Sequence, residues 1–268
     1  MSMKVRILDH GSMHCDLAWL VLKGGLTLAG RADHELPRQW VETPTFTVLI
    51  EHPDGLILWD TSCPDDWEER WAIAGNQEYF PYDGAAEEQH FVNTLEGLGL
   101  GLDAIDLVVM SHLHQDHAGN LRLLAEAGAK IMCSKDELDG ALGFDGPYQG
   151  AHIKSDYEGL EFETFSGDIE VAPGVRVLQS PGHTWGMCSL QVDLPKSGTI
   201  LFTSDAVYRS ENWGPPVVGS SIVWDNRAWE SSLERLRTIA NRADAMLVFG
   251  HDGDQMDELR RQRRLVFE

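Results

Sequence analysis

Four potential metal ligands lie within six consecutive residues of the chain: His112, His114, Asp116 and His117. They directly follow the apolar run Ile105–Met110, which we predict to be a strand. In an extended chain alternate side chains share one face, so the first three ligands can converge, and the fourth can turn in where a helix begins. Imidazole and carboxylate suit zinc, iron or manganese, and the absence of thiolate points away from structural zinc. The segment therefore predicts a metal site, with clustered surface or capping histidines as the alternative.

Four more segments carry a carboxylate or a histidine at a strand end or turn: Asp60-Thr61, Ser180-Pro181-Gly182-His183-Thr184, Ser204-Asp205-Ala206 and Phe249-Gly250-His251-Asp252. Taken alone, a histidine after Pro-Gly or after a buried strand is more often structural than a ligand. In this order, and together with the His-x-His-x-Asp-His pattern, they resemble the metallo-β-lactamase superfamily over most of the chain. Ser62 stands where that family usually has the glycine of Asp-Thr-Gly, which leaves the tightness of the turn open.

The resemblance implies a two-metal site with seven ligands. By this similarity His112, His114 and His183 hold the first metal, Asp116, His117 and His251 hold the second, and Asp205 bridges both. Two divalent ions, with zinc as the expected metal, lie roughly 3.5–4 Å apart in such sites and share a hydroxide formed from water whose pKa falls to about 7. Asp60 is expected outside the ligand set, accepting the spare N–H of a ligand histidine.

The stretch Asp205-Ala206-Val207-Tyr208 is similar to the Asp-x-x-Tyr of the N-acyl homoserine lactone lactonase-like branch. In that branch the tyrosine donates a hydrogen bond to the substrate carbonyl, so the resemblance implies this role for Tyr208; a tyrosine that only packs beside the metals is the alternative. The expected catalytic residues are Asp116 and Tyr208. The expected activity is opening of a lactone ring, N-acyl homoserine lactone-like or related, by attack of a metal-bridging hydroxide.

A thioesterase of the glyoxalase II type, or another ester hydrolase on the same two-metal site, is the alternative activity. Glyoxalase II enzymes carry a helical extension after the last histidine, whereas 17 residues follow His251 in this sequence. A degenerate member that only binds ligands would have lost metal ligands, and all seven are present. These features favour a lactonase that acts on a small lactone or ester.

The elements that must position these residues are read from hydrophobic periodicity. Residues Phe46–Glu51 and Leu56–Asp60, joined by His-Pro-Asp-Gly, predict a hairpin. Further strands are expected at Lys4–Leu8, Lys130–Cys133, Leu160–Phe165, Val175–Gln179, Ser189–Leu194, Thr199–Thr203 and Ala245–Phe249, and helices at Glu87–Leu98, at Leu121–Ala127 and after Asp225. Two runs of strands, each closed by helices, predict an α+β four-layer αββα sandwich formed as a single domain over residues 1–268.

Two irregular segments, Met13–Thr43 and Asp139–Gly159, are long for loops and are the expected borders of a substrate pocket. Aromatic residues in or near irregular segments either form an apolar wall of this pocket or belong to the core: Trp19, Trp40, Trp67, Trp71, Phe80 and Tyr82. His14 and His152 also lie on segments that are expected to border the site. The oligomeric state stays open, with a homodimer among the alternatives.

The charge of the chain argues against polyanionic partners. A formal net charge of -22 disfavours nucleic acids and anionic membranes. The N-terminal residues lack the apolar run of a signal peptide, and the scattered Cys15, Cys63, Cys133 and Cys188 fit free thiols, so we expect a soluble, cytoplasmic protein. The basic cluster of Arg260, Arg261, Arg263 and Arg264 is expected to be the exposed end of a terminal helix.

Overall fold

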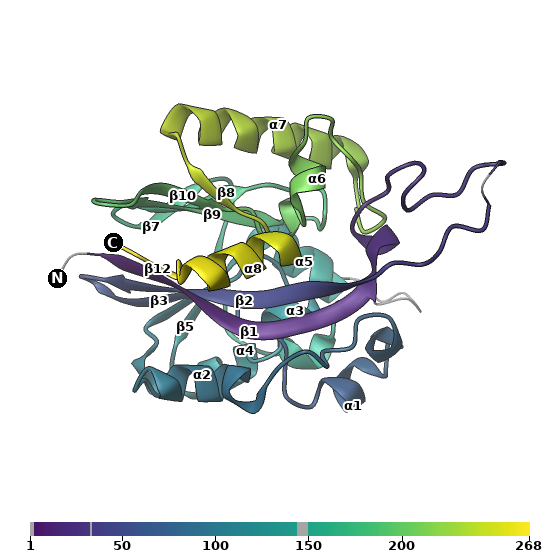
Figure 1. Ribbon diagram of the computed structural model, residues 1–268. Helices are drawn as coiled ribbons and strands as arrows, with labels where there is room; N and C mark the ends of the chain where they lie inside the picture. The colour runs from purple at the N-terminus through teal and green to yellow at the C-terminus, as the bar shows by residue number, and fades with distance from the viewer. Residues whose placement is uncertain (1–2, 33, 144–149) are drawn as a thin grey trace.

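The structure, a computed structural model, describes residues 3–32, 34–143 and 150–268. Its described strands form two sheets (Figure 1). The first sheet has the order β12 (Val266–Phe267), β1 (Lys4–Asp16), β2 (Trp40–His52), β3 (Gly55–Trp59), β4 (Leu107–Val109), β5 (Lys130–Ser134) and β6 (Glu163–Phe165). The second has the order β11 (Met246–Val248), β10 (Gly198–Phe202), β9 (Cys188–Leu194), β8 (Val175–Gln179) and β7 (Ile169–Ala172). Both sheets are mixed: β3 to β6 run parallel, as do β10 and β11, and the other pairs are antiparallel.

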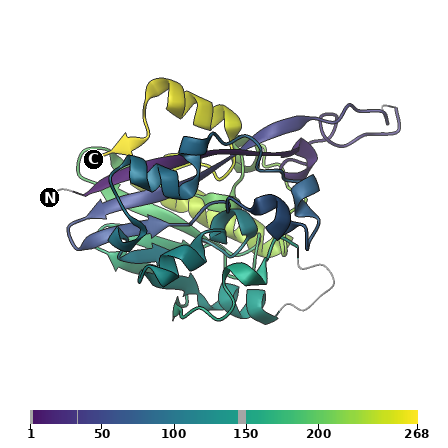
Figure 2. The same cartoon turned by 90° about the horizontal axis from the view of Figure 1, so that it is seen from below.

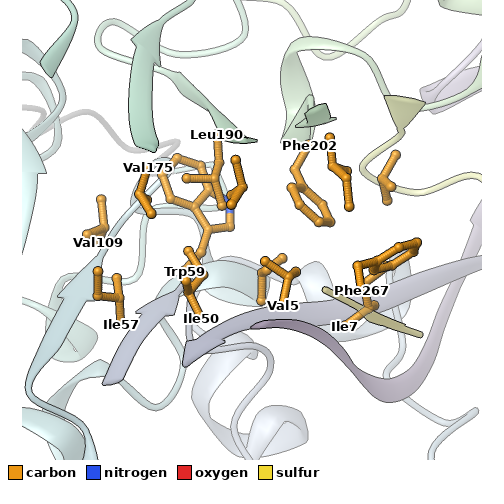
Figure 3. Packing of buried hydrophobic residues seen from close by; sticks show 14 of the residues in the cluster. Val5, Ile7, Ile50, Ile57, Trp59, Val109, Val175, Leu190, Phe202 and Phe267 are labelled. Atoms are coloured by element: carbon orange, nitrogen blue, oxygen red, sulfur yellow. The ribbon is translucent and has the colours of Figure 1, made fainter. Parts of the chain in front are cut away.

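The main core lies between the two sheets. Alternate apolar residues of the first sheet, such as Ile50 and Trp59, face apolar residues of the second, such as Leu190 and Phe202 (Figure 3). Each of these four side chains is almost fully buried. The alternation that sequence periodicity detects is therefore the inner face of a two-sheet sandwich.

Helices cover the outer faces of both sheets, as Figure 1 shows and Figure 2 shows from below. On the first sheet, α2 (Phe91–Gly97), α4 (Leu121–Glu126) and α5 (Lys135–Gly143) bury apolar residues in one cluster. On the second, α7 (Asn226–Ala243) packs Leu236 and Ala240 against the sheet, and the Asp225 carboxylate caps its first turn. The expected four-layer αββα architecture is confirmed.

The remaining helices lie at the ends of the strands. They are α1 (Trp67–Trp71), α3 (Gln115–Ala118), α6 (Ser210–Trp213) and α8 (Gly253–Gln262). The last turn of helix α8 contains Arg260 and Arg261, and Arg263 and Arg264 follow its end. The expected exposed end of a helix is found for three of these residues, whereas Arg260 is partly buried and pairs with Asp9 on β1. Among the described residues, no helix combines the length and the apolar character needed to cross a bilayer.

The two segments expected to be irregular are shorter than predicted. Met13–Asp16 pairs with Trp40–Thr43, so β1 and β2 continue into the first segment. A bulge between Asp9 and Ser12 shifts the register and hides this pairing from a simple alternation test. Gly11 is required in the bulge, because its φ is +77° and a Cβ would lie 2.6 Å from Ala85 Cα. The second segment begins inside α5, which extends to Gly143, and residues 144–149 lie outside the described part.

Candidate metal centre

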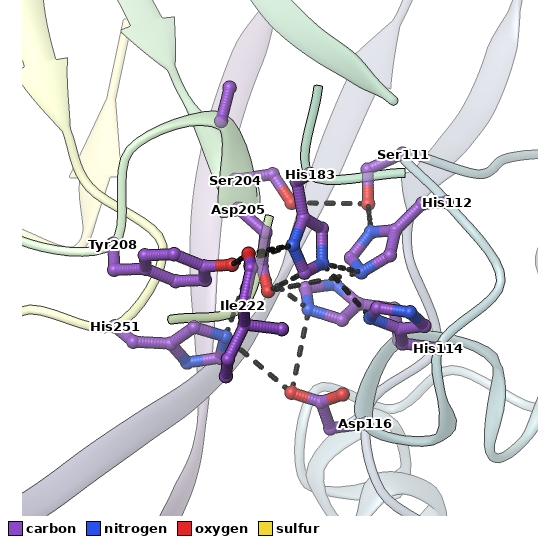
Figure 4. A network of polar contacts seen from close by, with 12 residues as sticks. Ser111, His112, His114, Asp116, His183, Ser204, Asp205, Tyr208, Ile222 and His251 are labelled. Carbon is purple, nitrogen blue, oxygen red and sulfur yellow. Dashed lines mark hydrogen bonds and ion pairs between the residues drawn. The ribbon is translucent and has the colours of Figure 1, made fainter. Parts of the chain in front are cut away.

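The seven expected ligands lie together at one edge of the sandwich, in two groups (Figure 4). One group consists of His112, His114, His183 and Asp205, and the other of Asp116, His117 and His251. Within each group, one potential ligand atom of every residue lies within 4.8 Å of those of the others. The two groups agree with the division that the sequence resemblance implies.

Each ligand follows the end of a strand or begins a short helix. His112 and His114 lie after β4, and α3 supplies Asp116 and His117. His183 follows β8, Asp205 lies in the 3-10 turn after β10, and His251 follows β11. Glycine is needed before two of these ligands: a Cβ at Gly182 would collide with the backbone of Trp229, and one at Gly250 would lie 2.7 Å from Ser204 O. These close approaches explain the Pro-Gly-His and Phe-Gly-His segments physically.

Asp205 lies between the two groups. Its Oδ2 is 3.4 Å from His183 Nε2 and 3.8 Å from His112 Nε2. Its Oδ1 is 3.0 Å from His251 Nε2 and 3.3 Å from His117 Nε2. One oxygen thus faces each group, which is the arrangement of a bridging carboxylate.

The second ring nitrogen of four ligand histidines is held away from the centre. Nδ1 of His112 contacts Ser111 Oγ at 2.9 Å, and Nδ1 of His117 contacts Asp60 Oδ2 at 2.9 Å. Backbone oxygens hold the other two: Ile222 O is 3.0 Å from His183 Nδ1, and Pro44 O is 2.9 Å from His251 Nδ1. Such partners fix the tautomer, so each Nε2 is free to bind a cation. Asp60 makes the expected contact with the spare ring nitrogen of a candidate ligand histidine.

Asp60 also anchors the strand that leads to the site. Its carboxylate accepts hydrogen bonds from Ser111 N and Ser111 Oγ, both at 2.7 Å. Asp60 and Ser62 have φ values of 61° and 58°, in the left-handed region. Ser62 therefore adopts the conformation that glycine would take most readily, and the turn is formed without it.

Electrostatics around the ligands fit a pair of cations. Burial lowers the pKa of His112, His114 and His183, which keeps these rings neutral. Burial also lowers the pKa of His117, but the carboxylates of Asp116, Asp205 and Asp60 outweigh burial and raise it. Bound cations would take the place of that proton, because imidazole binds metal only when neutral.

Two buried atoms in the described part of the chain support this interpretation. His117 Nε2 and Asp205 Oδ1 make no hydrogen bond of good geometry, although they lie 3.3 Å apart and His251 Nε2 lies 3.0 Å from the same oxygen. A buried polar atom without a partner is costly unless a ligand satisfies it. Two electron-pair donors facing each other in this way fit a shared cation, and the imidazole and carboxylate donor set suits zinc.

A cavity of about 700 Å³ opens over the two groups. Its floor includes His114, Asp116, Asp205, Tyr208 and His251. Its walls are mainly apolar and include Met13, Trp19, Leu20, Ile73, Phe80 and Ile222. Both segments expected to border a pocket contribute to it, the first through Met13, Trp19, Leu20 and Thr43 and the second through Gly150 and Ala151.

The expected aromatic wall is only partly correct. Trp19 and Phe80 line the cavity. Trp71 and Tyr82 are instead buried in a separate cluster, against which Trp67 packs, and Trp40 is exposed. His14 contacts Asp83 and does not line the cavity, whereas the ring of His152 lies 4.3 Å from that of His114.

Tyr208 is buried beside His183 at the cavity floor. Its hydroxyl lies 2.6 Å from His183 Nδ1 and donates to Ile222 O at 2.7 Å. Burial and the charge of Asp205 raise the pKa of Tyr208 well above its ordinary value, so the hydroxyl keeps its proton. Figure 4 shows the ring pointing toward the two ligand groups.

Sequence patterns do not single out Glu137, although it lies next to the site. It is fully buried at the start of α5, directly after Lys135 and Asp136, whose charges predict a solvated face. Burial raises the pKa of Glu137, but the hydrogen bond and charge of His152 and the amide of Leu113 outweigh burial and lower it. The side chain is therefore a buried carboxylate.

Comparisons with known proteins cover almost the whole chain. N-acyl homoserine lactonase AiiB of Agrobacterium fabrum is 29% identical over 273 residues, covering 97% of each chain. N-acyl homoserine lactonase AiiA of Bacillus thuringiensis subsp. kurstaki is 30% identical over 227 residues, covering 82% of this chain and 85% of its own.

Solved structures agree with these relatives. An N-acyl homoserine lactone hydrolase, with the product N-hexanoyl-L-homoserine bound at its catalytic metal centre, superposes with a TM-score of 0.78 at 27% identity. It covers 96% of each chain. A variant of B. thuringiensis AiiA with N-decanoyl-L-homoserine at its active site gives a TM-score of 0.80 at 26% identity, also over 96% of each chain.

The sequence model of the metallo-beta-lactamase superfamily matches residues 40–251. This range contains all seven residues of the two ligand groups and Tyr208. The chain therefore belongs to the metallo-beta-lactamase superfamily.

Proposed function

We propose that the protein is a two-metal hydrolase that opens the ring of N-acyl homoserine lactones. The observation that carries this proposal is the position of Asp205, which directs one oxygen to each ligand group at the floor of a largely apolar cavity. Relatives named N-acyl homoserine lactonases, similar over nearly the full chain, support the substrate class.

The proposed ions are two zinc ions. The first would be held by His112, His114 and His183, the second by Asp116, His117 and His251, and both by Asp205. When bound, the ions would supply a nucleophile at neutral pH by lowering the pKa of water to about 7, and would polarise the attacked carbonyl.

The side chains of the cavity floor complete the reaction. Tyr208 is proposed to donate a hydrogen bond from its hydroxyl to the lactone carbonyl oxygen, because burial raises the pKa of Tyr208 and keeps that hydroxyl protonated. Attack on the carbonyl carbon forms one C–O bond, and the ring ester C–O bond breaks. The leaving alcohol oxygen takes the proton that the attacking water loses, and the Asp116 carboxylate, which lines the cavity floor, is placed to carry it.

The apolar walls are proposed to bind the acyl chain. Trp19, Leu20, Ile73 and Phe80 offer hydrocarbon surface and no charge. Burying one methylene contributes about 0.8 kcal/mol, so the walls favour longer acyl chains over the bare lactone. The lactone ring is then directed to the polar floor.

The test is a comparison of kcat/KM among N-hexanoyl-homoserine lactone, its matched linear ester and its matched thioester. We expect the lactone to exceed both by at least about tenfold, and chelation followed by added zinc to abolish and restore turnover. Asp205→Asn, purified in parallel, controls for contaminating esterases. A preference for the thioester would replace the lactonase proposal with a thioesterase on the same site.

Residues 1–268 are proposed to form a single domain. The core between the sheets joins Val5 and Ile50 from the first half of the chain to Phe202 and Phe267 from the second. A cytoplasmic location is proposed as well, because Cys15, Cys63, Cys133 and Cys188 are free buried thiols. A homodimer stays a prediction that light scattering would test.

A further inference from the structure

The buried carboxylate of Glu137 connects three segments that surround the first ligand group. Leu113 N donates to Oε1 at 3.0 Å, and Gly186 N donates to Oε2 at 3.1 Å. His152 Nε2 lies 3.3 Å from Oε1. Each carboxylate oxygen is therefore bound by a backbone N–H from a different loop.

Two of these loops carry ligands. Leu113 lies between His112 and His114, so its amide fixes the backbone on which both rings are mounted. Gly186 follows His183 by three residues, and a Cβ there would collide with the backbone nitrogen of Glu137. The glycine thus permits the closest approach of the His183 loop to α5.

The third segment acts on a ligand ring. The ring of His152 packs edge-on against that of His114, with centroids 4.3 Å apart, and tilts against Trp185 at 5.0 Å. The Glu137 carboxylate contacts Nε2 of His152 and so holds the ring in this place. By contrast, the second group is anchored elsewhere, His117 by Asp60 and His251 by Pro44 O.

We propose that Glu137 is a positioning residue for the first ion, holding the loops of His112, His114 and His183 at the spacing that one cation requires. The inference rests on the proposed two-metal function. A carboxylate suits this task because both of its oxygens accept, whereas an amide would direct its NH2 group at one of the two backbone N–H groups. Loss of one of these hydrogen bonds would therefore weaken binding of the first ion and leave binding of the second unchanged.

The test uses zinc-free protein titrated with zinc in competition with a chromophoric chelator, which yields two binding constants for the parent. Glu137→Gln should weaken one constant by about 10- to 100-fold, the range for groups that orient metal ligands. His114→Ala removes a proposed ligand of the first ion, so the binding constant that it weakens is assigned to that ion. The other constant should stay within about threefold of the parent value.

Leu138→Ala is the matched control, because Leu138 is the next residue of the same helix and packs against the apolar cluster under it, whereas the hydrogen bonds of the Glu137 carboxylate go to Leu113, Gly186 and His152. It should lower Tm and leave both zinc constants unchanged. If Glu137→Gln behaves like Leu138→Ala, with a lower Tm and two unchanged constants, Glu137 only stabilises the fold and the inference is wrong. Equal weakening of both constants would also overturn it.

A second pair of variants keeps the test decisive if Glu137→Gln does not fold. His152→Leu removes a hydrogen bond to Glu137, and His152→Gln keeps a donor at that position. We expect His152→Leu to weaken the first constant several-fold and His152→Gln to restore most of it; no difference between them overturns the inference. A parent protein that binds fewer than two zinc ions would overturn the two-metal proposal as well, whereas two tight ions with no effect of Glu137 would overturn this inference alone.

Discussion

Replacement of Tyr208 by phenylalanine separates the work of its hydroxyl from that of the ions. The hydroxyl makes two contacts, one with His183 Nδ1 at 2.6 Å and one with Ile222 O at 2.7 Å. In Tyr208→Phe the His183 Nδ1 keeps Ile222 O at 3.0 Å as a partner. The ring orientation of His183, and with it the metal content, should therefore survive the substitution.

The expected loss in kcat is smaller than the usual effect of removing an oxyanion donor, for two reasons. Removing one preorganised oxyanion donor costs about 10²–10³ in kcat. Here a cation would face the same carbonyl oxygen, so the hydroxyl supplies only part of the stabilisation. The hydroxyl must also give up its bond to Ile222 O before it can reach the substrate. We therefore expect kcat to fall by about 10- to 100-fold, or roughly 1.4–2.7 kcal/mol in the barrier.

The assay measures kcat, KM and zinc content together, with N-hexanoyl-homoserine lactone as substrate. A lower kcat with little change in KM would place the hydrogen bond mainly in the transition state. Unaltered kcat in protein with both ions bound would show that Tyr208 only packs beside His183. A lower kcat that accompanies loss of zinc would show that Tyr208 acts through its contact with His183.

The family resemblance could indicate the two ligand groups from sequence because each proposed ligand lies in a short segment tied to a strand end. His112 and His114 alternate along an extended chain, and His183 and His251 each follow a glycine that the local packing requires. Backbone geometry therefore restricts both residue type and spacing at these positions. The order of the segments then reflects the order of the strands that carry them.

The choice of cavity-wall residues and the position of Glu137 could not be predicted, because both depend on contacts between segments without periodicity. Trp19 and Trp71 both lie in or near segments that the sequence predicts to be irregular. Trp19 lines the cavity, whereas Trp71 is fully buried in a hydrophobic cluster. Residue type is the same, and only the tertiary packing distinguishes them. Glu137 illustrates the opposite error: it follows the exposed charged residues Lys135 and Asp136, while its own carboxylate turns inward to two backbone N–H groups.

Three further predictions test the ligands, the cavity and the scaffold. Asp205→Asn should lose both zinc ions and activity, because a neutral amide binds cations weakly. Plasma emission spectrometry measures the zinc content, and near-normal turnover would show that Asp205 does not bridge the two ions. For acyl chains from butanoyl to octanoyl, kcat/KM should rise by about two- to fourfold per methylene, since about 0.8 kcal/mol per buried methylene corresponds to at most about fourfold; a flat series would place the chain outside the apolar walls. The last prediction concerns Asp156, whose pKa is raised to about 7 because burial outweighs the opposing charge of Arg70. A carboxyl group with a raised pKa in the folded state favours folding when it is protonated, so its contribution is present below about pH 4 and is lost as the pH rises through about 7. The free energy of unfolding of the zinc-free parent, relative to that of Asp156→Asn, should therefore fall across this interval by up to about 4 kcal/mol in urea titrations. A difference that does not change with pH would mean that the 3.0 Å contact with Arg70 keeps Asp156 ionised in the folded protein, and that burial has been outweighed by the ion pair.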